Sequence, residues 1–300
     1  MMKKFLVLGS SGYLGSRLFL ELDNGFGTYS NKNFGPKSRM FHLDISESGD
    51  LESLLILLKP DVVLNCIGFT NVDSCENQPE KNYMLNSWVP FQLASLCKEL
   101  SIKFVHFSTD HFTNSAEEKL MESDAISTIN QYSFAKFLAE RMIVQVNNSA
   151  IIIRANFFHF NFHSPRSFLD ILINTASKVD AVESFNDIYF TPVSTSYLIR
   201  CMKILLDLNF AGLVQIASNE VVSKFEFHEM VLKELGLNTI SHNPISVDKK
   251  NLIARRPKFM ALDNALLTKI TGTRAPNLYD MIGEEIIHSR ALEEFQSAKR

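Results

Sequence analysis

The stretch Lys3–Leu22, KKFLVLGSSGYLGSRLFLEL, gives the strongest indication of the fold. An apolar run at residues 5–8 is followed by Gly9, Gly12 and Gly15, and then by apolar residues at helical spacing. Proteins that bind a dinucleotide place such glycines between a strand and a helix. The glycines allow a tight turn, close approach of the backbone to the pyrophosphate, and close packing of helix on strand. An ordinary strand-to-helix turn would fit the same residues, so the neighbouring segments must decide.

Short apolar segments alternate with amphipathic ones through the first half of the chain. Further strands are predicted at residues 26–30, 40–45, 61–67, 103–109 and 150–158. Helices are predicted between them at residues 13–22, 48–60, 88–100 and 132–146. Strands that alternate with helices form βαβ units with right-handed crossovers and a parallel sheet. The sequence therefore predicts an α/β protein with a Rossmann-type, doubly wound parallel sheet.

The alternation loosens after Phe158. Helices are predicted at residues 167–178, 196–208, 223–236 and 278–295, with one strand at 212–218. This half is predicted to supply a smaller α/β substrate-binding lobe. The predicted division assigns residues 1–155, with a returning segment at about 186–218, to a domain that binds NADP(H). Residues 156–185 and 219–300 are assigned to the substrate-binding lobe.

The composition is that of an ordinary globular protein, with 46% hydrophobic and 21% charged residues. The net charge of −3 argues against a nucleic-acid partner, because such domains usually carry a basic excess. The four cysteines show neither a CxxC pair nor zinc spacing, which favours reduced thiols in a cytoplasmic protein. No apolar stretch approaches the roughly 18 residues of a membrane span, so no membrane partner is expected.

Two positions bear on the choice of cofactor. An acidic residue at the end of the second strand would bind the ribose 2′-hydroxyl of NAD, but that strand is followed by Asn31 and Lys32. The sequence therefore predicts NADP(H) rather than NAD(H), with Lys32 at the 2′-phosphate. Asp44, at the end of the third predicted strand, suits the adenine amino group. Asp44 would serve equally well as a cap for the helix that begins near Ser46. The sequence leaves both roles open.

A tyrosine and a lysine lie four residues apart in the helix predicted at 132–146. Tyr132 and Lys136 therefore share one helix face. The lysine charge lowers the pKa of the phenol, which can then donate a proton to a carbonyl oxygen while a nicotinamide delivers hydride. Such a YxxxK pair is common by chance. It gains weight from Ser108 and Thr109, which end an apolar strand where ligands bind in doubly wound sheets.

The glycine turn, the strand-end hydroxyl and the YxxxK pair resemble those of the extended short-chain dehydrogenase/reductase superfamily. More narrowly, the chain resembles the dTDP-4-dehydrorhamnose reductase family. The segments that carry this resemblance are residues 60–86, 104–112, 132–140, 151–158, 190–198 and 255–267. Within them, VDSCE and RPKFMALD are specific to the family, and the other segments are common across the superfamily. The resemblance extends from about residue 4 to residue 285.

The resemblance implies roles for individual residues. Thr109, Tyr132 and Lys136 become the catalytic residues. The cofactor is implied to contact Gly9, Ser11, Gly12, Tyr13, Leu14, Asp44, Ile45, Ile67, Gly68, Phe69 and Asn86, together with Tyr132 and Lys136. The sugar nucleotide is implied to contact Thr70, Val72, Asp110, His111, Asn156 and Arg256, with Arg256 near the diphosphate. His159 and His163 are interpreted as polar loop residues, so no metal site is predicted.

The chain departs from the family pattern on the sugar side of the site. His111 stands where the family usually has a tyrosine, in STDY, and the stretch RANFF lacks the tryptophan that commonly follows this strand. The only tryptophan, Trp88, lies elsewhere. Compared with the family pattern, the sugar side of this site offers more hydrogen-bonding groups and less flat apolar surface. This difference predicts that dTDP-4-dehydrorhamnose is not the best substrate.

The predicted function is NAD(P)H-dependent reduction of the keto group of a nucleotide-linked deoxysugar, and the resemblance leaves a homodimer open. Two alternatives remain. The first is an epimerase or a 4,6-dehydratase. The dehydratases resemble one another in a TDE motif, whose glutamate takes part in acid–base catalysis on the sugar ring. This chain has TDH at the same place and lacks that glutamate. The other alternative is a cofactor-binding regulatory subunit similar to the methionine adenosyltransferase β subunit.

Overall fold

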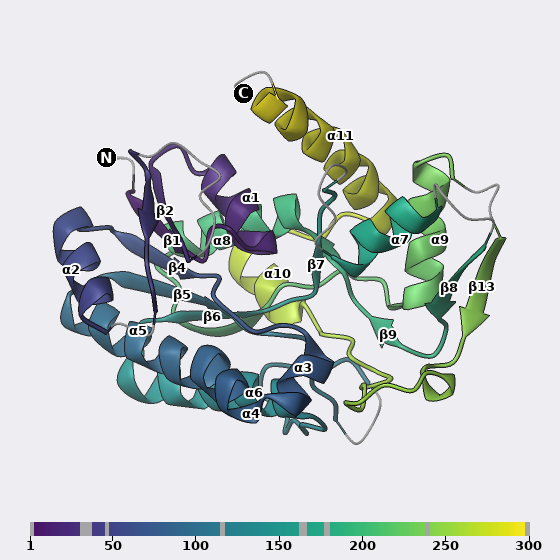
Figure 1. Cartoon of the computed structure of the whole chain (residues 1–300), viewed down its shortest axis with the longest axis horizontal. Coiled ribbons are helices and arrows are strands. Elements are labelled where there is room, and N and C mark those ends of the chain that lie inside the picture. The colour runs from purple at the N-terminus through teal and green to yellow at the C-terminus, as the bar shows by residue number, and fades with distance from the viewer. Residues whose placement is uncertain are drawn as a thin grey trace. The chain divides into compact units, whose positions relative to one another are not determined.

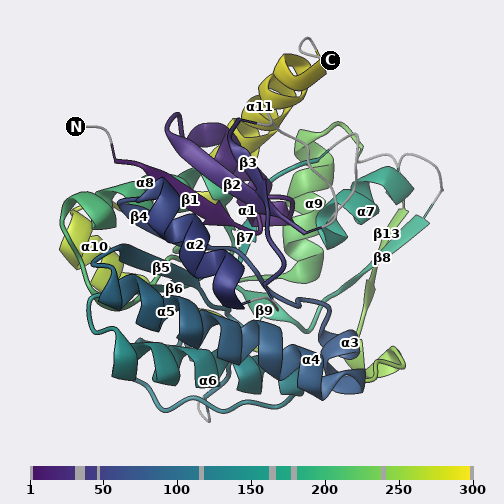
Figure 2. The ribbon, with the colours of Figure 1, turned by 60° about the vertical axis from the view of Figure 1, so that its left-hand side comes forward.

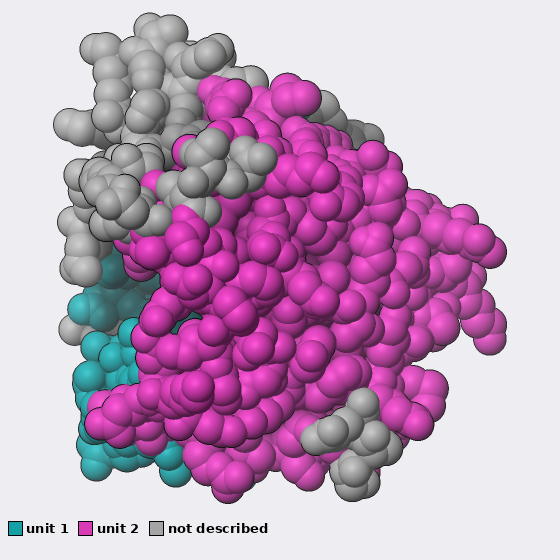
Figure 3. Space-filling model, turned by 90° about the vertical axis from the view of Figure 1, so that its right-hand side faces the viewer, with its two compact units in different colours: residues 1–109, 130–154, 209–214 teal, residues 110–129, 155–208, 215–300 magenta. Residues whose placement is uncertain are grey.

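The computed structural model describes residues 3–30, 38–45, 48–114, 118–161, 167–176, 181–237 and 241–297. The chain forms two compact units, coloured separately in Figure 3. Unit 1 comprises residues 1–109, 130–154 and 209–214, and unit 2 comprises residues 110–129, 155–208 and 215–300. Of the predicted returning segment, only 209–214 belongs to unit 1. Which residues bind cofactor and which bind substrate stays a prediction.

A seven-stranded sheet forms the centre of unit 1, with strand order β11-β6-β5-β4-β1-β2-β3. Its strands are β1 (Phe5–Leu8), β2 (Gly25–Tyr29), β3 (Met40–His42), β4 (Val62–Asn65), β5 (Lys103–Phe107), β6 (Ile151–Arg154) and β11 (Gly212–Gln215). Neighbouring strands from β3 to β6 pair in parallel, with Leu6 opposite both Phe26 and Val63. The chain reverses direction across the sheet between β1 and β4, the position where doubly wound proteins bind ligands. The predicted Rossmann-type α/β fold is confirmed.

Helices cover both faces of this sheet (Figures 1 and 2). The helical segments of unit 1 are α1 (Tyr13–Glu21), α2 (Ser48–Leu58), α3 (Val72–Asn77), α4 (Pro79–Tyr83), a π-helical turn (Met84–Trp88), α5 (Val89–Glu99) and α6 (Gln131–Val146). Helices α2, α5 and α6 bury one continuous apolar cluster against the strands, in which Leu55, Leu93 and Ile143 are almost fully buried. Helix α1 lies on the opposite face.

Several predicted strands end earlier than the sequence indicated. Strand β3 stops at His42 rather than at residue 45, because its partner β2 ends at Tyr29. The Tyr29 carbonyl accepts the last hydrogen bond between them, from the amide of Leu43. The strand predicted at 150–158 is divided after Arg154. Its last residues form β7 (Phe157–Phe158), which pairs in parallel with β10 (Val193–Ser194) in a separate two-stranded sheet.

In its described residues, unit 2 combines helices with three two-stranded sheets. Its helices are α7 (Phe168–Ala176), α8 (Thr195–Asp207), α9 (Lys224–Glu234), α10 (Ala265–Thr271) and α11 (Leu278–Ser297), with a 3-10 turn at Val247–Lys249. Its other strands are β8 (Ala181–Phe185), β9 (Tyr189–Phe190), β12 (Val222–Ser223) and β13 (Ser241–Ile245). None of these four strands was predicted; β9 and β12 are two-residue pairings, which leave no hydrophobic alternation in the sequence.

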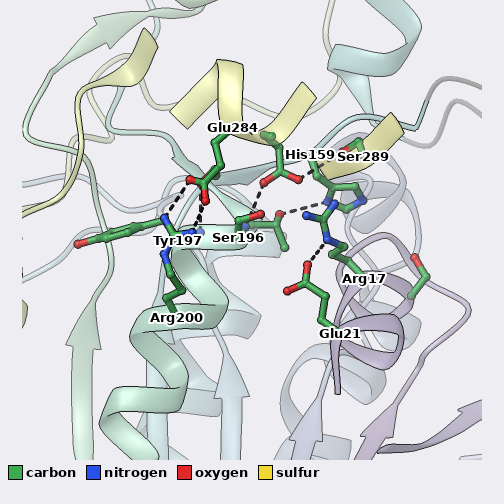
Figure 4. A network of polar contacts seen from close by, with 12 residues as sticks. Arg17, Glu21, His159, Ser196, Tyr197, Arg200, Glu284 and Ser289 are labelled. Carbon is green, nitrogen blue, oxygen red and sulfur yellow. Dashed lines mark hydrogen bonds and ion pairs between the residues drawn. The ribbon is translucent and has the colours of Figure 1, made fainter. Parts of the chain in front are cut away.

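Polar contacts join α8 to α11 within unit 2 (Figure 4). Arg200 donates two hydrogen bonds to the carboxylate of Glu284, and the amide of Ser196 donates to Glu285 over 3.1 Å. His159 is buried and shares a 3.1 Å hydrogen bond with the hydroxyl of Thr195. Its ring is therefore part of the polar packing of unit 2, and His163 lies outside the described residues.

All four cysteines are free thiols. The described part of the chain contains no group of three or more His, Cys, Asp or Glu side chains arranged to hold a metal ion. None of its helices combines the length and the apolar character needed to cross a bilayer.

Candidate active site

The glycine turn connects β1 to α1 in a conformation that requires its glycines. Gly9 adopts a φ of +73°, and a Cβ atom there would lie 3.2 Å from the backbone of Cys66. A Cβ atom on Gly15 would lie 2.3 Å from the carbonyl oxygen of Gly9, so a side chain at this position would push α1 away from the turn. The amide of Gly12 closes the turn with a 2.9 Å hydrogen bond to the Gly9 carbonyl.

The N-terminus of α1 fits an anionic group. Its cap residue is Gly12, which has no side-chain acceptor for the helix amides, and the first turn carries no acidic residue. The amides at this end therefore keep their capacity to bind phosphate oxygens. Ser11 and Tyr13 are half-buried here, whereas the side chain of Leu14 is buried in the core, so Leu14 can offer only its backbone.

The loop after β4 is fixed by asparagine side chains. Asn86 is buried; its Oδ1 accepts from the amide of Phe69 over 3.0 Å, and its Nδ2 donates to the Phe69 carbonyl over 2.7 Å. Asn65 accepts from the amide of Ile67 over 3.1 Å. Gly68 has little free space, because a Cβ atom would lie 3.2 Å from the Asn86 amide oxygen. Asn86 thus shapes the predicted cofactor floor by holding its backbone.

The predicted adenine end of the site is only partly described. Asp44 lies two residues beyond β3 and is exposed. Ile45 lines a cavity of about 300 Å³ between α2 and α5, together with the aromatic side chains of Trp88 and Phe91. Lys32, the residue predicted to meet a 2′-phosphate, lies outside the described residues.

Helix α6 carries the predicted catalytic pair. Asn130 and Ser133 form a capping box that fixes the start of the helix. Tyr132 and Lys136 are one turn apart on a buried face, with 8% and 5% of their surface exposed. Thr109, also buried, follows the carboxyl end of β5.

Lys136 is anchored at that strand end. Its ammonium donates a 2.7 Å hydrogen bond to the carbonyl oxygen of Phe107, two residues before Thr109. Burial lowers the pKa of Lys136 to about 8, and the carboxylate of Glu140 opposes this shift. The lysine is therefore mostly protonated at neutral pH and can stabilise a phenolate.

Glu140, which sequence reasoning missed as a site residue, connects three elements. Its buried carboxylate accepts two hydrogen bonds from Arg154 at the end of β6, at 2.9 and 2.7 Å, and one from the hydroxyl of Ser108. The spacing Tyr132–Lys136–Glu140, which places a carboxylate on the same helix face, was a signal for it.

A second cluster of predicted site residues lies in unit 2. The amide Nδ2 of Asn156 donates to the buried carboxylate of Asp110 over 2.7 Å. Burial lowers the pKa of His111, and the charges of Lys224 and Arg256 also lower it, so its imidazole is neutral at neutral pH. Lys224 was missed by sequence reasoning, because nothing local relates it to residues more than one hundred positions earlier.

The predicted site residues therefore form two groups. Unit 1 brings together the turn, the floor and the catalytic pair, and it also contains Thr70, which is exposed, and Val72, which begins α3. Unit 2 brings together Asp110, His111 and Asn156, with the charge of Arg256 acting on His111.

The chain is similar to known proteins along most of its length. The model of a family described as RmlD substrate binding domain matches residues 2–289. The "Probable low-salt glycan biosynthesis reductase Agl14" of Haloferax volcanii is 28% identical over 283 residues, which span 91% of this chain and 94% of that protein. The dTDP-4-dehydrorhamnose reductase of Escherichia coli is 22% identical over 267 residues, 84% of this chain and 86% of the relative.

A solved structure shows the same fold. The dTDP-4-dehydrorhamnose reductase of Bacillus anthracis, in complex with NADP, superimposes with a TM-score of 0.83 at 19% identity and covers 96% of this chain and 100% of its own. With a family model that spans nearly the whole sequence, the conclusion is direct: the chain belongs to the RmlD substrate binding domain family.

Proposed function

We propose that this protein reduces the keto group of a nucleotide-linked deoxysugar with NADPH. The observation that carries the proposal is the placement of Tyr132 and Lys136 on one buried face of α6, with Lys136 anchored at the strand end that carries Thr109. This strand end lies on the same edge of the parallel sheet as the glycine turn. The reductase names of the relatives support the same chemistry.

The chain's own residues supply the proton and the positioning. A bound reduced nicotinamide supplies the hydride. The hydroxyl of Tyr132 donates its proton to the carbonyl oxygen of the sugar, which becomes the new alcohol. The ammonium of Lys136 stabilises the resulting phenolate, and the hydroxyl of Thr109 donates a hydrogen bond to the same sugar oxygen. The carbonyl of Phe107 keeps the ammonium in place.

Cofactor binding is assigned to the remaining residues of unit 1. The Gly9–Gly12 turn and the first amides of α1 hold the pyrophosphate, with Ser11 and Tyr13 beside it. The loop at Ile67, Gly68 and Phe69 forms the floor, and the apolar side chain of Ile45 lies at the adenine end. Preference for NADP(H) rests on Lys32 and on the absence of an acid after β2.

Substrate binding is assigned to the polar cluster of unit 2. Asp110 and Asn156, joined by their hydrogen bond, and the neutral imidazole of His111 offer donors and acceptors to sugar hydroxyls. Because these groups would be left unpaired by a less polar sugar, the preferred substrate is a 4-keto-deoxysugar nucleotide other than dTDP-4-dehydrorhamnose.

A panel of 4-keto-sugar nucleotides tests the proposal by oxidation of NADPH. Tyr132→Phe keeps the ring but removes the proton, so we expect turnover to fall by about 10²–10⁴-fold while the Kd for NADPH stays unchanged. Thr109→Val serves as a milder companion, since it removes one hydrogen bond. If the parent and Tyr132→Phe turn over equally, or if the parent reduces no panel member, the chain acts as a cofactor-binding regulatory subunit instead.

A further inference from the structure

Lys224 holds a positive charge beside the predicted sugar pocket. It begins α9 directly after β12, and its amide donates a 2.9 Å hydrogen bond to the carbonyl of Ile188. Its ammonium lies 3.4 Å from the centroid of the Phe190 ring, on the strand that pairs with β12. The Phe190 ring is 1% exposed and therefore cannot turn away. A cation–π contact and a fixed backbone thus set where this charge lies.

The ammonium lacks a strong partner in the described ranges. There it forms neither an ion pair within 4.0 Å nor a hydrogen bond, and its recorded contact is the Phe190 ring. The carboxylate that acts on it electrostatically is Asp110, which instead accepts the hydrogen bond of Asn156 at 2.7 Å. The three donors of this half-buried ammonium are therefore available to a ligand.

Positive charge acts on this cluster from two side chains, Lys224 and Arg256. Burial lowers the pKa of Lys224 to about 8, against the opposing field of Asp110, so the group is mostly protonated at neutral pH. Arg256 carries a second positive charge that acts on His111, whose imidazole is neutral. The cluster therefore favours a ligand that brings a negative charge with oxygen acceptors.

We propose that Lys224 is a ligand-binding residue of unit 2 that donates hydrogen bonds to an anionic oxygen group of the bound sugar nucleotide. The inference rests on the proposed function, since it places the sugar nucleotide at this cluster. The anionic oxygens can come from the diphosphate or from a carboxylate on the sugar. Both present the same chemistry to an ammonium, and binding measurements separate them.

Calorimetric titration of the full chain provides the test. The probes are inorganic pyrophosphate, UDP, UDP-glucose and UDP-glucuronic acid, which differ in whether they carry a diphosphate, a neutral sugar or a carboxylate. Lys224→Met removes the charge at similar length, and Lys224→Arg keeps it. Lys233→Met is the matched control, because Lys233 lies on the same helix, is exposed, and also places its ammonium near an aromatic ring, 5.7 Å from that of Tyr279.

We expect Lys224→Met to raise the Kd by about 10- to 100-fold, the range of a charge-assisted hydrogen bond, and Lys224→Arg to restore most of the affinity. Equal loss for pyrophosphate, UDP and both sugar nucleotides identifies the diphosphate as the group bound. A loss confined to UDP-glucuronic acid identifies the carboxylate. Lys233→Met should bind every probe as the parent does.

Unchanged affinities in Lys224→Met, or an equal loss in Lys233→Met, overturn the inference, and so does a parent that binds none of the probes. The proposed function fails separately. Lys224-dependent binding of pyrophosphate without turnover of any keto sugar would keep the binding site and reject the reductase. Turnover of a keto sugar with the same KM in the parent and in Lys224→Met would keep the reductase and reject Lys224 as a binding residue.

Discussion

At the scale of single residues, the ionisation of Lys136 sets a pH limit on catalysis. Burial brings its pKa down to about 8, and Glu140 keeps it from falling further. The charged form is fully present well below that pH and is lost as the pH rises through about 8. Only the charged form can stabilise a phenolate at Tyr132, so we expect kcat/KM to decrease across this window.

The pH dependence of kcat/KM for the best panel substrate measures this effect, because that ratio reports groups of the free enzyme. Lys136→Met should lose most of the rate. Because the pKa of Lys224 is also lowered to about 8, the decrease near pH 8 is assigned to Lys136 only if it persists in Lys224→Met. A profile in the parent that stays level from neutral to strongly alkaline pH would contradict the assignment. The thiol of Cys66 does not interfere, since burial raises its pKa far above this range.

At the scale of elements, Gly15 controls how closely α1 approaches the phosphate-binding turn. An alanine Cβ would lie 2.3 Å from the Gly9 carbonyl oxygen, so Gly15→Ala must displace the helix or the turn. We expect weaker NADPH binding and a lower Tm. Gly283→Ala is the control: this glycine lies inside α11 with nothing within 4 Å of an added Cβ, and the change should stabilise the helix by about 0.5–1 kcal/mol.

Fluorescence titration of NADPH and thermal unfolding of the two variants separate a packing effect from helix propensity. Equal effects of Gly15→Ala and Gly283→Ala on NADPH binding would show that close helix–turn packing is not what the cofactor needs.

The Glu140–Arg154 pair holds α6 to the ends of β5 and β6. Only 4% and 5% of these two side chains is exposed, whereas the Arg200–Glu284 pair between α8 and α11 is 47% and 43% exposed. Glu140→Gln leaves the Arg154 charge buried without its carboxylate, which we expect to cost about 3–5 kcal/mol of unfolding free energy. Glu284→Gln should cost less than about 1 kcal/mol, because water solvates the freed guanidinium.

Urea unfolding of both single variants tests the difference, with Arg154→Met combined with Glu140→Gln as a third variant. Removal of both charges should recover part of the loss, because no unpaired charge then remains buried. If Glu140→Gln and Glu284→Gln lowered the free energy of unfolding by similar amounts, burial would not determine how much these ion pairs contribute to stability.

At the scale of the whole molecule, cofactor binding should raise the stability of the folded chain. A ligand that binds only the folded state stabilises it by about 2.7 kcal/mol at one hundred times its Kd. If NADPH binds more tightly than NADH, then equal concentrations should give a larger increase in Tm with NADPH. Lys32→Ala should reduce the difference between the Tm increases that NADPH and NADH produce. A larger increase with NADH would contradict the predicted preference.

The sequence by itself determined the features that depend on short spacing along the chain. The glycines at Gly9, Gly12 and Gly15 follow one strand directly, and Tyr132 and Lys136 are one helical turn apart, so local geometry already placed them together. Alternation of strands and helices was enough to predict the parallel sheet. These signals survive in a sequence because each is set by a handful of consecutive backbone angles.

Only the tertiary structure decided which distant residues support those groups. Glu140 meets Ser108 and Arg154 because α6 crosses the ends of β5 and β6, and Asn86 meets Phe69 because the helices after β4 fold back on its loop. Lys224 comes under the field of Asp110 although more than one hundred residues separate the two in the chain. Contacts of this kind depend on strand order, register and burial, which no local pattern records.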